Sequence, residues 1–218
     1  MNIRPSTVVH AVVGACVAGA VVLAAQPPAD KGKPAEKGAA PAQPGGEMDQ
    51  QKMMEQWMAL MKPGKAHELL ARQAGNWDCT MKVYMGGPGS APMTSQGKAV
   101  MKTVLNGKFL SQEYEGKMMG MDMKGMGLTG YDNYRKQYVT TWADTMGTSI
   151  LHMTGSMSPD GKVQTMFTQM DEPTLGEIGK HVKYVTRFVD DNTMNFEAWE
   201  VQYGPEFKVF EIEYKRAK

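Results

Sequence analysis

Residues 94–115 have the sequence TSQGKAVMKTVLNGKFLSQEYE, and this stretch decides the fold class. On each side of Asn106-Gly107 the chain shows the period-two pattern that is typical of strands. Asn and Gly tolerate the positive φ angles that a two-residue hairpin turn requires. The stretch therefore predicts a β-hairpin with strands over 94–105 and 108–115.

The same pattern continues in both directions from this hairpin. Turn signals such as Pro159-Asp160-Gly161 and Gly204-Pro205 separate the segments. No connection is long enough for a helical crossover, so the strands should form an antiparallel meander. The expected strands cover 77–85, 94–105, 108–115, 119–129, 136–144, 148–157, 162–170, 180–190, 193–202 and 206–216.

Several strands carry apolar residues on both faces. In 206–216, for example, Phe207 and Val209 alternate with Phe210 and Ile212. A flat sheet would leave one apolar face uncovered, whereas a closed barrel has an interior and no edges. We therefore predict an all-β domain over 75–218, built as one antiparallel up-and-down β-barrel of about ten strands, a size that can hold a small ligand.

A helical segment is expected before the barrel, over 47–74. Met54, Trp57, Met58 and Met61 recur at helical spacing, and Pro63-Gly64 end that helix at about residue 62. A second short helix should cover 65–74. The prediction is thus one or two short amphipathic helices, which would cap a barrel mouth, pack on the outside, or offer the Met-rich face to a partner.

The first 25 residues predict export to the periplasm or out of the cell. Arg4 precedes the apolar run VVHAVVGACVAGAVVLAA at 8–25, which ends in small residues, as a signal peptide does. Cleavage is expected after Ala24 or Ala25. An uncleaved membrane anchor and a lipoprotein modified at Cys16 are the alternatives. Residues 26–46, rich in Pro, Ala, Gly and Lys, should form a disordered linker.

The charge balance excludes some partners. Lys and Arg number 24 against 23 Asp and Glu, for a net charge of +1. Nucleic-acid binding needs a basic footprint, so no nucleic-acid partner is expected. After signal cleavage no stable membrane span is expected, and the sequence does not set the oligomeric state. Cys79 would then be the one remaining cysteine, expected to be a small buried residue rather than half of a disulfide.

Methionine is over-represented, with 21 residues in the chain. Met119, Met121 and Met123 would share one strand face, and thioethers are ligands that suit Cu(I). The other interpretation is that flexible Met side chains fill a barrel wall, which the Met residues elsewhere in the sequence favour. Cu(I) binding is therefore the alternative, and the favoured interpretation expects no cofactor.

The candidate chemistry is sparse. Asp132 and Asp144 could be paired acids at a barrel mouth, with Tyr131 and Trp142 as stacking surfaces, or Asp132 could simply make a turn. No His-Glu-x-x-His, Cys-x-x-Cys or Gly-x-Ser-x-Gly motif occurs. We therefore expect a non-enzymatic barrel that binds a small apolar or amphipathic molecule, with an enzyme that uses acids at the mouth as an alternative. The candidate binding residues are Trp77, Met119, Met121, Tyr131, Trp142 and Asp144.

Several strings together resemble a known bacterial family, the domain-of-unknown-function family DUF1579. They are Gly75-x-Trp77-Asp78, Val104-Leu105-Asn106-Gly107-Lys108-Phe109-Leu110, Glu113-Tyr114-Glu115-Gly116, Gly125-x-Gly127-Leu128-Thr129-Gly130-Tyr131-Asp132-Asn133, Trp142-x-Asp144-x-Met146-Gly147-Thr148 and Glu211-Ile212-x-Tyr214. The resemblance covers roughly residues 65–217. It implies a lipocalin-like barrel that is often exported, and it implies no activity. The chain departs from the family pattern at Asp122-Met123-Lys124 and at Met126, which adds thioethers to one hairpin.

Overall fold

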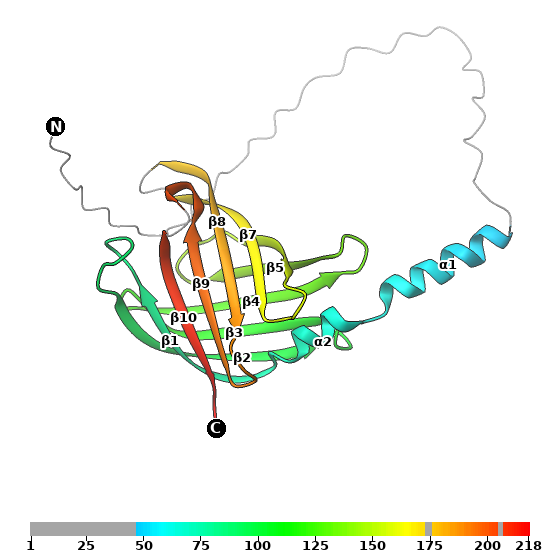
Figure 1. Cartoon of the computed structure of the whole chain (residues 1–218), viewed down its shortest axis with the longest axis horizontal. Helices are drawn as coiled ribbons and strands as arrows, with labels where there is room; N and C mark the ends of the chain where they lie inside the picture. Colours follow the sequence, from blue (N-terminus) through cyan, green and yellow to red (C-terminus); the bar gives the residue numbers. More distant parts are fainter. Residues whose placement is uncertain (1–46, 173–175, 205–206) are drawn as a thin grey trace, which may run out of the picture. The chain divides into compact units, whose positions relative to one another are not determined.

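The computed structural model describes residues 47–172, 176–204 and 207–218, so the predicted signal segment 1–25 and linker 26–46 lie outside the described residues. Ten antiparallel strands form one closed barrel, in which each strand pairs with its sequence neighbours and β1 pairs with β10 (Figure 1). This confirms the predicted up-and-down barrel. The strands are β1 (Gly75–Val83), β2 (Met93–Val104), β3 (Phe109–Met118), β4 (Met121–Asp132), β5 (Gln137–Asp144), β6 (Leu151–Met157), β7 (Val163–Glu172), β8 (Glu177–Phe188), β9 (Thr193–Glu200) and β10 (Lys208–Arg216).

The β2–β3 hairpin occurs where the sequence predicts it, but its connection is longer. Val104 pairs with Phe109, so four residues rather than two make the turn. Leu105, Asn106 and Gly107 all have positive φ, at 49°, 59° and 76°. The expected Asn-Gly turn is therefore extended by one further left-handed residue on its N-terminal side.

The β3–β4 hairpin differs more from the prediction. The expected strands ended at 115 and began at 119, whereas Met118 pairs with Met121 and the chain turns at Met119 and Gly120. Those two residues have φ of 51° and 82°, as a tight two-residue hairpin turn requires. Residues 116–118, which lie between the two expected strands, are therefore part of β3.

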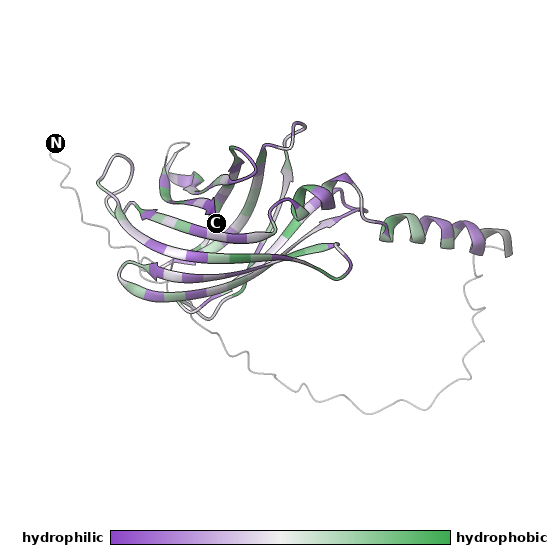
Figure 2. Ribbon diagram, turned by 90° about the horizontal axis from the view of Figure 1, so that it is seen from below, coloured by the Kyte–Doolittle hydropathy of each residue, from purple (hydrophilic) through white to green (hydrophobic). Residues whose placement is uncertain are grey.

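Alternate residues of each strand point into the barrel and form its core. Along β1, Trp77, Cys79 and Met81 are buried, while the intervening Asp78 is exposed. Figure 2 shows the corresponding alternation of hydrophobic and hydrophilic residues along the strands. Cys79 is fully buried, which confirms its predicted role as a small core residue.

Helix α2 (Lys65–Ala71) packs at one end of the barrel, named here the α2 end, where it contacts β2, β3 and β4. Leu70 is buried in the core, and the ring of His67 meets Tyr131 edge-on at 5.9 Å. The hydroxyl of Tyr138 donates a hydrogen bond to the carbonyl oxygen of Ala66 at 3.3 Å. These contacts hold α2 against β4 and β5 at this end of the barrel.

Arg216, the last residue of β10, ties three segments together at the α2 end. Its guanidinium donates hydrogen bonds to the carbonyl oxygens of Ala74 (2.7 Å), Arg72 (3.1 Å) and Asp191 (3.0 Å). The same group lies 4.3 Å from the ring centre of Trp77. Arg216 therefore fastens the end of the last strand to the connection that leads into the first.

Helix α1 (Glu47–Met61) is described by itself. The predicted helix over 47–62 is present, and Met53, Met54, Trp57 and Met58 on it are all more than half exposed. Within the described ranges, no helix combines the length and the apolar character that crossing a bilayer requires.

Replacing Arg216 with Met should lower the free energy of unfolding by about 2–3 kcal/mol, because charge-assisted hydrogen bonds to three carbonyl groups are lost. Urea unfolding followed by circular dichroism measures the change. The neighbouring Lys215 pairs only at the surface with Glu213, so Lys215→Met should change stability by no more than about 0.5 kcal/mol. Equal effects of the two substitutions would contradict the role given to Arg216.

The thiol of Cys79 should resist alkylation in the folded protein. Burial first, and then the negative charge of Asp78, raise the pKa of this thiol to about 12, so the reactive thiolate is scarce at pH 8. We expect peptide mapping after iodoacetamide treatment at pH 8 to find Cys79 unmodified in the native protein and modified in urea. Rapid labelling of Cys79 without denaturant would contradict its burial.

Candidate functional site: a methionine-lined lumen

The barrel encloses a cavity of about 210 Å³, named here the lumen. Its wall is made of inward-pointing residues from all parts of the sheet, together with Gln73, which follows α2. Methionine is the commonest residue type in this wall. The nine methionines are Met81, Met101, Met118, Met123, Met146, Met153, Met166, Met170 and Met194.

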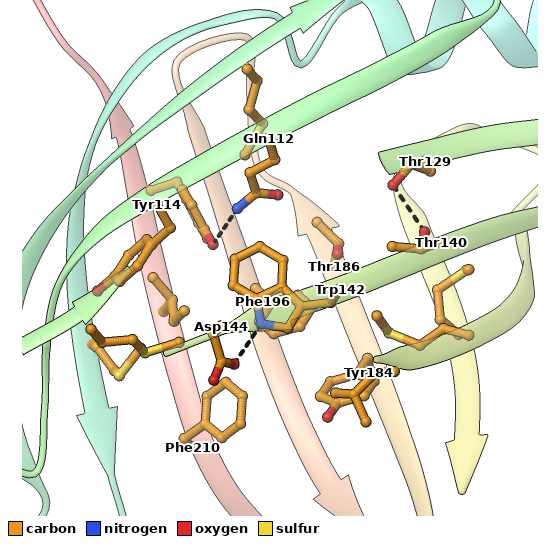
Figure 3. Close-up of a pocket in the computed structure, with 18 of the residues that line it drawn as sticks. Gln112, Tyr114, Thr129, Thr140, Trp142, Asp144, Tyr184, Thr186, Phe196 and Phe210 are labelled. Atoms are coloured by element: carbon orange, nitrogen blue, oxygen red, sulfur yellow. Dashed lines mark hydrogen bonds between the residues drawn. The ribbon is translucent and has the colours of Figure 1, made fainter. Parts of the chain in front are cut away.

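One side of the lumen is an aromatic wall contributed by β8, β9 and β10. The rings of Tyr184 and Phe196 are stacked, with centres 5.3 Å apart and planes 13° apart. Phe210 lies next to them, 5.9 Å from Phe196. The three rings line the cavity, as Figure 3 shows.

Trp142 and Asp144, both on β5, form another part of the lining. The indole Nε1–H of Trp142 donates a hydrogen bond of 2.8 Å to one carboxylate oxygen of Asp144 (Figure 3). The other oxygen accepts 2.9 Å from the backbone N–H of Met146. The carboxylate is therefore held in a fixed orientation at the end of β5.

Glycine on the neighbouring strand makes room for this tryptophan. A Cβ atom at Gly125 would lie 2.3 Å from Cζ2 of Trp142, and one at Gly127 would lie 2.9 Å from Cε3. The indole thus lies directly on the backbone of β4. This close approach gives a physical reason for the Gly125-x-Gly127 spacing that the sequence analysis noted.

The lumen carries a negative charge. Among the lining residues that the structure describes, Asp144 alone has a formally charged side chain. Burial in the wall is the main cause that raises the pKa of Tyr184, and the negative charges of Asp144 and Glu200 raise it further. Asp144 is therefore close enough to the aromatic wall to disfavour further negative charge there.

Three buried polar groups of the lining have no hydrogen-bond partner in the described protein. They are the amide nitrogens of Gln73 and Gln164 and the hydroxyl of Tyr114. Burial raises the pKa of Tyr114 to about 12, so its hydroxyl stays protonated and able to donate at neutral pH. All three atoms are fully buried, so a molecule in the lumen would reach them only after neighbouring side chains move.

A buried ionic cluster lies inside the barrel on β7, β8 and β9. Nζ of Lys180 lies 2.9 Å from Oε1 of Glu200 and 3.8 Å from Oε2 of Glu172. All three side chains are at least nine-tenths buried, and none belongs to the lumen lining. One amine is thus matched against two carboxyl groups.

The structure brings together only two of the six predicted binding residues. Trp142 and Asp144 line the lumen in direct contact. Trp77 is buried beneath Arg216, and Tyr131 packs against His67 at the α2 end. Met119 lies in the β3–β4 turn, and Met121 is half exposed next to it.

The three methionines of the Cu(I) alternative do not share one environment. Met119 occupies the turn with positive φ, Met121 is 51% exposed, and Met123 is 7% exposed and lines the lumen. In the described ranges, no group of three His, Cys, Asp or Glu side chains is arranged to hold a metal ion. Cu(I) binding through thioethers stays a prediction.

The two acids of the enzyme alternative lie apart. Asp132 pairs with Gln137 at one end of the β4–β5 hairpin, and Asp144 pairs with Gly125 at the other, about 23 Å along the strand. Asp132 accepts hydrogen bonds from the backbone N–H groups of Arg135 and Tyr134, which lower the pKa of its carboxyl. The turn interpretation of Asp132 is therefore the one that fits.

Sequence reasoning missed most of the lining. The methionines of β1, β2, β6, β7 and β9 that meet in the lumen are far apart in the sequence, and their distribution alone indicates only a general preference for Met. Their signal was available in the strand alternation, because Met81 shares a strand face with Trp77 and Cys79. The sequence does not show which strands face one another across the barrel.

The fold and this lumen define the class of protein, a single antiparallel β-barrel with an internal, largely apolar cavity. The chain belongs to the DUF1579 family, whose model, described as a protein of unknown function, matches residues 62–216. A search of curated proteins found no match.

Three solved structures are similar to this chain at low sequence identity. The S-type phycobiliprotein lyase CPES from Guillardia theta is 11% identical, with a TM-score of 0.50, over 70% of this chain and 93% of that chain. Rv2717c from M. tuberculosis is 18% identical, with a TM-score of 0.46, over 72% of this chain and 100% of that chain. A redesigned β-barrel, mFAP0, bound to DFHBI, is 15% identical, with a TM-score of 0.35, over 66% of this chain and 99% of that chain.

Replacing Gly125 with Ala should displace the indole of Trp142, because the new Cβ cannot share the space of the ring. We expect the indole N–H signal of Trp142 to shift in a ¹⁵N–¹H spectrum as its bond to Asp144 is lost. We also expect the unfolding free energy to fall by about 1–3 kcal/mol. The exposed neighbour Lys124 gives the control Lys124→Ala, which should leave the Trp142 signal in place. An unchanged Trp142 signal in Gly125→Ala would contradict the packing described.

Proposed function

We propose that the protein binds a small apolar or amphipathic molecule in the lumen and carries out no reaction on it. The observation that carries the proposal is a cavity of about 210 Å³ lined by nine methionines and an aromatic wall. Ligand sites in proteins are mostly apolar cavities with a few oriented polar groups, and this lining fits that description.

The nature of the wall supports a binding role. Methionine side chains are flexible and polarisable, so they adapt to apolar ligands of irregular outline. Gln73, Gln164 and Tyr114 add a few polar side chains to the otherwise apolar wall. The carboxylate of Asp144 already accepts two hydrogen bonds, and no His or Cys of the described chain lines the cavity to act with it.

We propose further that the protein acts outside the cytoplasm. The support is the apolar run at 8–25 with its small-residue end, followed by the Pro-, Ala- and Gly-rich stretch at 26–46. N-terminal sequencing of the protein from its native host should find a mature chain that begins after Ala24 or Ala25. A chain that begins at residue 1 and remains in the cytoplasm would contradict export.

Filling the lumen should abolish binding. We expect delipidated protein to bind the neutral fluorescent probe 1-aminoanthracene at one molecule per chain. Met123→Trp should weaken the affinity by about tenfold or more, because the larger side chain occupies the space that the ligand needs. Fluorescence titration gives both the affinity and the stoichiometry.

The matched control lies on the same strand. Met126 points outward and is 65% exposed, so Met126→Trp adds the same side chain outside the barrel and should leave the affinity unchanged. Wild-type protein that binds no probe, or equal loss of binding in both variants, would contradict the proposal.

A further inference from the structure

We propose that the lumen selects ligands with a protonated amine, whose ammonium group pairs with Asp144 while an apolar body lies among the methionines. This inference rests on the proposed binding function and specifies the charge of the ligand. It places the charged end near the β5–β6 connection and the apolar end towards the α2 end of the barrel.

The negative charge of the lining is the first reason to expect a ligand with an ammonium group. Asp144 is the one formally charged side chain among the described lining residues, and it is an acid. A fatty acid in this lumen would bring a second carboxylate into an apolar space with no lysine or arginine of the described lining to balance it. Like charges in such a space repel strongly, whereas an ammonium group and a carboxylate attract.

The geometry of the Asp144 carboxylate is the second reason to expect an ammonium group. Each carboxylate oxygen accepts one hydrogen bond from the protein, from Trp142 or from the backbone of Met146. Each oxygen therefore keeps accepting capacity for a further donor, and an ammonium group brings three donors. The two protein bonds fix the carboxylate before a ligand arrives, so little order is lost on pairing.

The position of Asp144 fits the head group of an amphiphile. The lining includes Asp144, Met146, Gly147 and Ser149 at the end of β5 and in the connection to β6, and Ser149 is exposed. The lumen therefore reaches the surface beside Asp144. A charged group held there stays close to water while the apolar part of the ligand is buried.

The aromatic side chains add to the preference for a cation. Trp142 donates a hydrogen bond to Asp144, and Phe196, Phe210 and Tyr184 line the same cavity (Figure 3). Faces of aromatic rings attract cations, and they do so most strongly away from water. Aromatic side chains that line a site are a known means of binding organic ammonium groups.

The nearby ionic cluster does not reverse this preference. Lys180 is engaged by Glu200 and Glu172 at 2.9 and 3.8 Å, so its amine lies between two carboxyl groups. The raised pKa of Tyr184, caused by burial and then by Asp144 and Glu200, agrees with a negative field at the wall. The charges that the structure describes inside the barrel thus favour a positive ligand.

Three ligands that share a ten-carbon chain test the inference. Decylamine, decanol and decanoate are positive, neutral and negative at pH 7, and each can be titrated into the full delipidated chain, below its micelle concentration, to displace 1-aminoanthracene. We expect decylamine to bind about tenfold more tightly than decanol, as a charge-assisted hydrogen bond provides. Decanoate should bind more weakly than decanol.

Asp144→Asn then tests the residue. The substitution should lower the affinity for decylamine about tenfold and leave that for decanol unchanged. Asp78 is exposed on the outer face of β1, so Asp78→Asn is the control and should alter neither affinity. Should Asp144→Asn fail to fold, the order of the three affinities for the wild-type protein tests the amine preference by itself.

The outcomes separate the two proposals. Equal affinity for decylamine and decanol, or tightest binding of decanoate, would overturn the amine preference and leave the binding function standing. Failure of 1-aminoanthracene and all three ligands to bind would overturn the binding function itself.

Discussion

The pairing of β1 with β10 is the constraint on which the rest of the structure depends. Seven residue pairs, from Trp77 with Arg216 to Val83 with Phe210, join segments more than 120 residues apart in the chain. This pairing leaves no free sheet edge and fixes which face of every strand is internal. Arg216 secures the closure at the α2 end, and the lumen exists because the closed sheet surrounds it.

Local packing explains how a small protein can hold an ordered carboxylate inside an apolar space. The backbone of β4 gives up side chains at Gly125 and Gly127, so the indole of Trp142 lies flat and its N–H reaches Asp144. The free-energy cost of burying part of the carboxylate is offset by two hydrogen bonds from the protein and by the nearness of solvent at the exposed Ser149. The same two glycines of β4 therefore allow the sheet to pack closely and the site to form.

The barrel was predictable from the sequence because alternation and turn residues are local signals. All ten strands and both helices occur near their expected ranges. The errors lie at hairpin turns: residues 116–118 pair although the expected strand ends at 115, and Leu105 adopts a left-handed conformation. The site was less predictable, since Trp142 and Asp144 are neighbours in sequence but Met81, Met166 and Met194 meet only through closure.

The thioether lining determines what kind of discrimination this protein can exert. Unbranched side chains with three rotatable bonds re-pack around guests of different outline with little strain. A wall of flexible side chains excludes few ligands by their shape. Selection among ligands would therefore depend on the few rigid polar groups of the lining. Under the proposed binding function, this lining would distinguish ligands by their charge more than by their shape.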